Sequence, residues 1–308
     1  MTKFIAAAVQ WAPIVHDSAA CADKAVQAIA DAAREGARLV VLPEAWIPGY
    51  PYWAGTSIRS AEYQGFLQEF NRQAIRVPGP ETERIQAAAA KHQCTVVFGC
   101  DERAAGSIYC TIVYIGSDGR LLGKHRKLMP TLTERMVWAM GDGSDLEAYD
   151  TDCGRIGGLN CFEHHMALAR YAVGSLGVQV HASLWPGYEW LNPIVDACTR
   201  QLAFENACFV VVAREVMSPE QIAVNMPQVE IDRSGYQMTG GSAIIAPGGT
   251  YLAGPVSGEK ETIVCAEIDL DRCLQQKWWF DGYGHYARPD VMRLDWDRRA
   301  KRAVRDRD

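Results

Sequence analysis

The chain has 308 residues, of which 48% are hydrophobic and 22% charged, the balance of a globular protein with a full core. Its formal net charge of -6 argues against nucleic-acid binding, because no basic face dominates. The apolar run at the N-terminus is too short for a signal peptide, and no uninterrupted apolar stretch approaches membrane length. The ten cysteines include no C-x-x-C pair, and several lie in apolar, strand-like runs. We therefore expect a cytoplasmic protein with reduced thiols and no contact with a membrane.

The first half of the chain alternates strands with helices. Asp17 or Ser18 is placed to cap a helix between two buried strands, a βαβ unit that implies parallel pairing. Gly-Ser-Asp-Gly at 116–119 predicts a hairpin, so the sheet is mixed. We expect strands at 3–10, 38–42, 95–99, 108–115 and 120–124, and helices at 18–33, at 59–74 and from Pro80.

The second half continues the alternation without a linker. We expect strands at 145–150, 155–160, 177–184, 208–213, 242–246 and 262–268, with helices at 166–173 and 190–207. Such a pattern favours the α/β class, with two mixed sheets between layers of helices in a four-layer αββα sandwich. We expect one domain over residues 1–295 and a charged, solvated tail over 296–308.

Cys161 follows the predicted strand 155–160 at a tight turn that leads into a helix. A thiol at such a turn lies near the positive end of the helix dipole, where the thiolate is favoured. Gly157 and Gly158 allow the backbone to come close to its neighbours there. The arrangement is the thiol counterpart of the serine nucleophile elbow.

Glu44 and Lys127 also lie in loops directly after apolar strands, so both side chains are expected at the same sheet edge as Cys161. A buried glutamate can take the thiol proton and pass it to a leaving nitrogen. Lysine can stabilise a developing anion, with the backbone N–H of Phe162 as a second donor. Cysteine is the nucleophile in this scheme, and no histidine is required as base.

Other interpretations of these residues stay open at this point. Glu44 is also compatible with an ordinary loop acid, and Lys127 with one member of a solvated basic cluster. His164 and His165 are potential metal ligands beside Cys161, but the spacing matches no consistent ligand set. We therefore expect no metal site and place both histidines on the helix surface or behind the reacting groups.

Three blocks of sequence resemble the catalytic blocks of the nitrilase superfamily, and more narrowly its true nitrilase branch. They are residues 42–51, 123–131 and 158–164, and residues 142–145 and 284–290 are similar to that branch as well. The likeness covers residues 4–294. It implies an αββα sandwich with a Glu-Lys-Cys triad at Glu44, Lys127 and Cys161, supported by a second glutamate at Glu134. Phe162 stands where nitrilases commonly have tryptophan, which reshapes the pocket.

The resemblance implies hydrolysis of an organic nitrile to a carboxylic acid and ammonia, through a thioimidate and a thioester, with no cofactor. It also implies a homodimer or a higher homo-oligomer, while the short stretch after residue 290 argues against a long spiral assembly. Aromatic or arylaliphatic nitriles are expected from the pocket candidates Tyr52, Trp53, Trp138, Phe162, His165, Trp185 and Tyr188. The alternatives are an aliphatic amidase or carbamoyl hydrolase with the same triad, a cyanide-hydrolysing enzyme, and a scaffold without activity.

Overall fold

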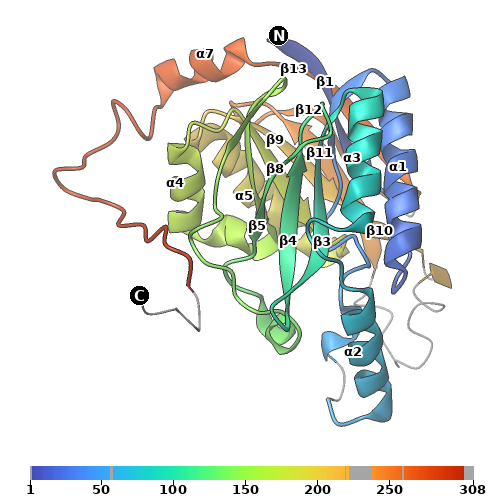
Figure 1. Cartoon of the computed structure of the whole chain (residues 1–308). Coiled ribbons are helices and arrows are strands. Elements are labelled where there is room, and N and C mark those ends of the chain that lie inside the picture. Colours follow the sequence, from blue (N-terminus) through green and yellow to red (C-terminus); the bar gives the residue numbers. More distant parts are fainter. Residues whose placement is uncertain (1, 56–57, 219, 222–236, 259, 302–308) are drawn as a thin grey trace.

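Two mixed β-sheets lie face to face between outer helices in the computed structural model of the chain (Figure 1). The structure describes residues 2–55, 58–218, 220–221, 237–258 and 260–301. The expected four-layer αββα sandwich is confirmed, with α1 and α3 outside one sheet and α4 and α5 outside the other. No helix of these residues is long and apolar enough to cross a membrane.

The first sheet has the strand order β13-β1-β2-β3-β4-β5. The expected βαβ unit is present, since β1 pairs in parallel with β2 and the Asp17 carboxylate accepts the Ala20 N–H at 2.9 Å to cap α1. The elements of this half are β1 (Lys3–Gln10), α1 (Ser18–Arg34), β2 (Ala37–Val41), η1 (Tyr52–Gly55), α2 (Ala61–Gln73), α3 (Pro80–His92), β3 (Thr95–Ala104), β4 (Ser107–Ile115), β5 (Leu121–Arg126), η2 (Leu132–Met136) and β13 (Thr262–Asp269).

The second sheet has the order β10-β11-β9-β8-β7-β6, with β12 paired to β11. Its centre is parallel, because β7, β8 and β9 are joined by helical crossovers. The elements of this half are β6 (Tyr149–Thr151), β7 (Gly154–Asn160), η3 (Cys161–His165), α4 (Ala167–Ser175), β8 (Val180–Trp185), η4 (Glu189–Leu191), α5 (Asn192–Glu205), β9 (Phe209–Arg214), β10 (Val216–Met217), β11 (Met238–Ile245), β12 (Tyr251–Ser257) and α7 (Asp271–Trp279).

The apolar strands of the sheets are buried on both faces. On β1, Ala6 and Ala8 belong to the core between the two sheets, whereas Ala7 and Val9 pack under α1 and α3. This division follows from the two-residue period of a strand, which sends successive side chains to opposite faces. Nearly continuous apolar runs are therefore what a sheet covered on both sides requires.

The strand expected at 145–150 is wrong over most of its length, because only β6 (Tyr149–Thr151) pairs. Asp145 instead uses its carboxylate to accept the Arg126 N–H at 3.2 Å and to contact His125. Leu146 and Ala148 pack in the cluster that contains α4, as residues two apart on an extended segment can, but residues 145–148 form no ladder with a neighbouring strand. β12 and α7 escaped prediction because they bury little apolar surface: β12 is largely exposed, and Cys273 is the buried residue of α7.

The described part of the charged segment after residue 295 makes a few contacts with the body of the protein, while residues 297–301 remain exposed. Trp296 packs beside the cluster that contains Leu146, and Arg298 forms an ion pair with Glu147. The backbone N–H of Lys301 donates to the Asp142 carboxylate at 2.7 Å. The remainder of the expected tail, residues 302–308, lies outside the described residues.

Candidate active site

Three loops from the two sheets bring polar side chains to one place. Glu44 follows β2, Lys127 follows β5 and Cys161 follows β7, so each comes directly from the end of a strand. Glu134 joins them from the 3-10 helix η2. Carboxylate oxygens of Glu44 and Glu134 and the Cys161 sulfur all lie within 4.8 Å of one another. The structure therefore brings together all four residues that the sequence singled out for chemistry.

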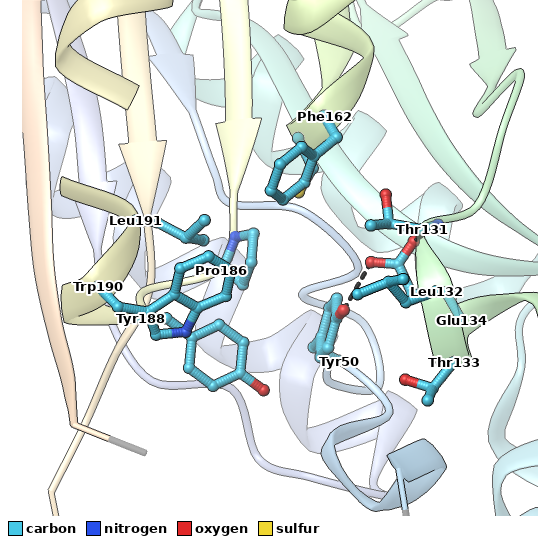
Figure 2. Close-up of a pocket in the computed structure, with 11 residues that line it drawn as sticks. Tyr50, Thr131, Leu132, Thr133, Glu134, Phe162, Pro186, Tyr188, Trp190 and Leu191 are labelled. Atoms are coloured by element: carbon cyan, nitrogen blue, oxygen red, sulfur yellow. Dashed lines mark hydrogen bonds between the residues drawn. The ribbon is translucent and has the colours of Figure 1, made fainter. Parts of the chain in front are cut away.

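Cys161 and Glu134 line a cavity of about 340 Å³, and Glu44 and Lys127 lie behind them. Figure 2 shows aromatic side chains around it, with Tyr50 facing Glu134, and with Tyr188 and Trp190 on the side opposite Glu134. The lining residues are Tyr50, Thr131, Leu132, Thr133, Glu134, Cys161, Phe162, Pro186, Tyr188, Trp190 and Leu191. The cavity is thus mostly apolar, with a few convergent polar groups, which is the character of a small-molecule site.

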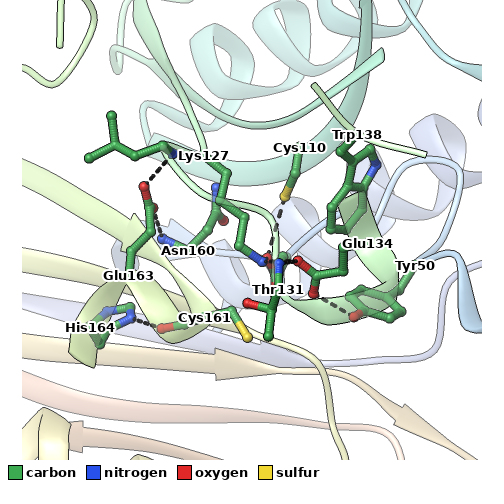
Figure 3. Close-up of polar contacts among 12 residues, drawn as sticks. Tyr50, Cys110, Lys127, Thr131, Glu134, Trp138, Asn160, Cys161, Glu163 and His164 are labelled. Atoms are coloured by element: carbon green, nitrogen blue, oxygen red, sulfur yellow. Dashed lines mark hydrogen bonds and ion pairs between the residues drawn. The ribbon is translucent and has the colours of Figure 1, made fainter. Parts of the chain in front are cut away.

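The Lys127 ammonium lies between two carboxylates. Its Nζ donates to Glu44 Oε1 at 2.8 Å and to Glu134 Oε2 at 2.7 Å, and the second contact is visible in Figure 3. Glu134 also accepts the Thr131 N–H at 2.6 Å and the Tyr50 hydroxyl at 2.5 Å. Among the described residues, one group of side chains could offer ligand atoms to a metal ion, and it consists of Glu44, Glu134 and Cys161. In this group the Lys127 ammonium already supplies a positive charge to both carboxylates.

Burial and charge set the protonation states of the triad. Burial raises the pKa of Glu44 to about 7, although Lys127 opposes the rise. Burial also raises the pKa of Cys161 well above its ordinary value, Glu44 raises it further, and Lys127 lowers it. For Lys127, burial lowers the pKa, but Glu44 and Cys161 outweigh burial and the pKa is raised well above normal. The resting site therefore holds a neutral thiol, a permanent ammonium and a carboxyl group that titrates near neutral pH.

One oxygen of Glu44 is left for the chemistry. Oε1 accepts from Lys127 and from the Cys110 thiol at 3.4 Å, whereas the buried Oε2 has no hydrogen-bond partner among the described residues. A buried carboxylate oxygen without a partner is costly unless a substrate, water or proton completes it. The unpaired Oε2 is thus the acceptor that a general base needs.

The backbone is strained at each of the three loops. Ala45, directly after Glu44, has a φ of 45°, Leu132 a φ of 47°, and Cys161 itself a φ of 49°. Left-handed conformations of this kind cost of order 1–3 kcal/mol each and gather at functional sites. The elbow also needs close packing, because a Cβ at Gly158 would meet the Ala182 carbonyl oxygen at 2.5 Å. Cys161 opens the short helix η3, one turn before α4 begins.

Glu163 holds two of these loops together. Its Oε1 accepts the Leu128 N–H at 2.7 Å, and its Oε2 accepts the Asn160 N–H at 2.8 Å. Leu128 follows Lys127 and Asn160 precedes Cys161, so one carboxylate fixes the spacing of the catalytic cation and the thiol (Figure 3). His125 completes this carboxylate from Nε2, at 3.1 Å from Oε1.

His125 is positively charged in this arrangement. Its second ring nitrogen faces the Asp145 carboxylate at 3.2 Å, so both nitrogens have acceptors and both carry a proton. Burial lowers the pKa of His125, but the Glu163 and Asp145 carboxylates outweigh burial and bring the pKa to about 10.

The aromatic residues expected in the pocket have different positions. Phe162 and Tyr188 line the cavity, whereas Tyr52, Trp53, His165 and Trp185 do not. Tyr52 is buried and donates its hydroxyl to Glu215, with its ring against Tyr50 and Tyr188. Trp53 packs with Tyr63 and Phe70. The Trp185 ring stacks on the His164 ring with 4.9 Å between centroids, and His165 is exposed. The centroid of the Trp138 ring lies 5.3 Å from Lys127 Nζ, so Trp138 packs against the ammonium and not on the cavity lining.

Sequence reasoning missed two residues of the pocket wall. Pro186 directly follows β8, and Trp190 lies in η4 on the same loop, so the strand-end rule applies to them as well. Buried Arg214 holds this wall from behind, because its guanidinium donates to the Tyr188 carbonyl at 2.6 Å and the Pro186 carbonyl at 3.3 Å. Arg214 stands at the end of the apolar strand β9, and this position was the sequence feature that could have indicated its role behind the pocket wall.

Comparison with known proteins gives the class of this site. The family model described as carbon-nitrogen hydrolase matches residues 5–277. The aliphatic nitrilase of Rhodococcus rhodochrous is 39% identical over 96% of this chain and 83% of its own length. The bromoxynil-specific nitrilase of Klebsiella pneumoniae subsp. ozaenae is 38% identical over 98% of this chain and 88% of its own length.

The fold agrees with solved structures. The crystal structure of Nit3 from Saccharomyces cerevisiae, described as a member of branch 10 of the nitrilase superfamily, matches with a TM-score of 0.71 at 22% identity, over 90% of this chain and 94% of that one. The chain therefore belongs to the carbon-nitrogen hydrolase family, the nitrilase superfamily. It is accordingly a hydrolase of carbon–nitrogen bonds.

We predict that Glu163→Gln weakens both the fold and the activity. The substitution removes the charge that pairs with buried His125, and loss of one partner of a buried pair costs about 3–5 kcal/mol of unfolding free energy. Displacement of Lys127 relative to Cys161 should also lower kcat about tenfold or more. Urea unfolding and turnover measure the two effects. Glu69→Gln, which breaks the surface pair with Arg72, is the matched control and should cost about 1 kcal/mol or less.

We predict that kcat/KM rises with pH through about 7. Glu44 acts as a base in its ionised form, and because its pKa is raised to about 7, that form is lost as the pH falls below this value. Initial rates between about pH 5 and pH 9 measure this rise of kcat/KM with pH. Samples that are held at each pH and returned to neutral pH before assay control for irreversible unfolding. A profile that stays flat from about pH 9 down to about pH 5 would show that Glu44 is not the titrating base.

Proposed function

We propose that this protein is a nitrilase that converts an organic nitrile to its carboxylic acid and ammonia. The observation that carries the proposal is the buried contact of Lys127 with Glu44 and Glu134. Carboxylate oxygens of both glutamates lie within 4.8 Å of the Cys161 sulfur, and Cys161 lines an aromatic cavity. The nitrilases from Rhodococcus rhodochrous and Klebsiella pneumoniae, each similar to nearly the whole chain, support it.

The first half of the reaction forms a thioimidate. Cys161 Sγ attacks the nitrile carbon while its proton passes to Glu44, and Glu44 returns that proton to the nitrogen. Lys127 stabilises the negative charge that develops on the nitrogen, and the Phe162 N–H is a second donor. Glu134 holds Lys127 in position and does not itself exchange protons with the substrate.

The second half releases the products. Glu44 takes a proton from water, which adds to the thioimidate carbon and gives a tetrahedral intermediate. Protonation of the nitrogen expels ammonia and leaves a thioester on Cys161, which a second water hydrolyses to the acid. If the tetrahedral intermediate expels the cysteine sulfur instead, the product is the amide. The balance therefore depends on whether the proton of Glu44 reaches nitrogen or sulfur.

Aromatic or arylaliphatic nitriles are the substrates that we favour. Four aromatic side chains line the cavity: Tyr50, Phe162, Tyr188 and Trp190. The aromatic ring of a substrate packs favourably against such side chains. A volume of about 340 Å³ suits a single ring with a short side chain. Phe162 and Tyr188 are the substrate contacts that we retain from the sequence; Tyr52 and Trp185 support the wall from behind.

We further propose a cytoplasmic homodimer or higher homo-oligomer, with residues 1–295 as one carbon-nitrogen hydrolase domain. Large apolar side chains on α4 and α7 support contacts between copies, because Leu168, Trp278 and Trp279 are 66%, 76% and 69% exposed. All ten cysteines are free thiols, which suits a reducing compartment.

Ammonia release from a paired substrate panel tests the proposed function. We expect turnover of arylacetonitriles and benzonitriles but not of their amides, and loss of turnover in Cys161→Ala. Cys265→Ala, at a partly exposed thiol outside the cavity lining, is the matched control and should keep full activity.

Each other outcome of the panel has a definite meaning. Turnover of amides alone would make the protein an amidase, and turnover of cyanide alone a cyanide hydrolase. Activity on nothing in the panel, with Cys161 unreactive to a thiol reagent, would favour a scaffold. Full activity of Cys161→Ala would refute the proposed nucleophile.

A further inference from the structure

Two buried histidines behind the nucleophile have no part in the reaction described above. His164 lies in η3 and His181 in β8, and both are fully buried. His164 Nδ1 is 2.7 Å from the Cys161 carbonyl oxygen, a contact drawn in Figure 3, and His164 Nε2 is 3.1 Å from His181 Nε2. The pair therefore forms a line of contacts that ends on the backbone of Cys161.

The contacts fix which nitrogen carries each proton. A carbonyl oxygen only accepts, so His164 Nδ1 is the donor to Cys161. Burial lowers the pKa of both histidines, to about 3 for His181, so both rings are neutral and His164 Nε2 has no proton. His181 Nε2 must then be the donor to His164. His181 Nδ1, which carries no proton, has no hydrogen-bond partner among the described residues.

The acceptor at the end of this line belongs to a critical peptide group. The Cys161 carbonyl and the Phe162 N–H are the two polar ends of one peptide unit, and the Phe162 N–H lies where it lowers the pKa of the Cys161 thiol, against the larger effect of burial. A hydrogen bond into the carbonyl polarises the amide and strengthens the N–H at its other end. The same bond holds the carbonyl direction that the left-handed Cys161 backbone requires.

We propose that His181 and His164 form a neutral hydrogen-bond relay that orients and polarises the Cys161–Phe162 peptide, and so favours the Cys161 thiolate. Both are positioning residues, because neither touches the reacting atoms. The inference rests on the proposed function in one respect, that Cys161 is the nucleophile. It adds residues outside the Glu-Lys-Cys triad to the control of thiol reactivity.

The surroundings hold the relay in place without giving it charge. Trp185 stacks on the His164 ring at 4.9 Å with an interplanar angle of 24°. Arg170 Nη1 donates to the His164 carbonyl at 2.8 Å. The nearby cations Arg170, on the His164 side, and His125, on the His181 side, both disfavour protonation of the relay, as does His165 if charged.

The charged groups that face the Cys161 thiol come from other loops. Glu44 and Glu134 raise its pKa, and Lys127 lowers it. A neutral relay therefore changes the reactivity of the thiol without disturbing the charge balance of the triad.

Amide side chains offer a matched test of the relay. The side-chain N–H of asparagine lies near the position of histidine Nδ1, and that of glutamine near the position of Nε2. His164→Asn therefore keeps the donor to Cys161, and His164→Gln loses it. At His181 the pattern is reversed, since His181→Gln keeps the donor to residue 164 and His181→Asn loses it.

The readout is the pH dependence of Cys161 alkylation by iodoacetamide, measured on the Cys161 peptide by mass spectrometry, together with kcat. In His164→Gln and His181→Asn we expect the apparent pKa of Cys161 to rise by about one unit, an approximately tenfold loss of thiolate at a given pH. His181→Gln should remain close to the unsubstituted protein. His164→Asn keeps the donor to Cys161 but loses the acceptor for His181, so its apparent Cys161 pKa should lie between that of the unsubstituted protein and that of His164→Gln. Urea unfolding of all four variants separates this effect from a loss of stability.

Two results would overturn the relay. In one, asparagine and glutamine variants behave alike at each position; in the other, alkylation follows only the free energy of unfolding. The alkylation readout requires no nitrile turnover, so a failed relay is distinguishable from a failed assignment of activity. Turnover that survives in Cys161→Ala would end the proposed function, whatever the alkylation results.

Discussion

The site depends on one buried ammonium that is shared by two buried carboxylates. Each ion costs several kcal/mol to remove from water, and their attraction offsets that cost only when the remaining hydrogen bonds are also made. Tyr50 and the Thr131 N–H complete Glu134, so this carboxylate is fully occupied. Glu44 is left with one oxygen unpaired and a pKa of about 7, and this asymmetry separates a holding carboxylate from a reacting one. In the proposed mechanism, the same lysine stabilises the negative charge that forms when Cys161 attacks.

Everything around this ammonium fixes distances between loops that come from different sheets. Glu163 links the loop of Lys127 to the strand end of Cys161, and charged His125 completes it from the side of β5. The strained residues Ala45, Leu132 and Cys161 show that the loops are held in conformations that isolated chains avoid. Arg214 performs the equivalent task for the pocket wall, through backbone carbonyls instead of charge pairs. Precision of the site is thus built into the ends of the strands, not into the helices.

The sequence predicted the reacting groups better than the pocket around them. Glu44, Lys127 and Cys161 could be found because each follows an apolar strand, and strand ends meet at one edge of a sheet. Trp53 and Trp185 were expected in the pocket, yet they are buried outside its lining, because an aromatic side chain fits a core as well as a pocket and only packing decides between them. Trp190, an exposed side chain in η4 that lines the cavity, was missed. The strand expected at 145–150 is mostly absent, and the Asp145 carboxylate instead contacts the His125 ring and accepts the Arg126 N–H. These are long-range contacts, which the local sequence pattern does not predict.

The central claim is that Cys161 carries the substrate as a covalent intermediate beside Lys127. Acid quenching during steady-state turnover of a slow aromatic nitrile, followed by peptide mass spectrometry, measures this directly. The account predicts an adduct of acyl or imidate mass on the Cys161 peptide, absent from the other nine cysteines and from Cys161→Ala. Steady turnover with no adduct at Cys161, and with that thiol still open to alkylation at saturating substrate, would contradict it.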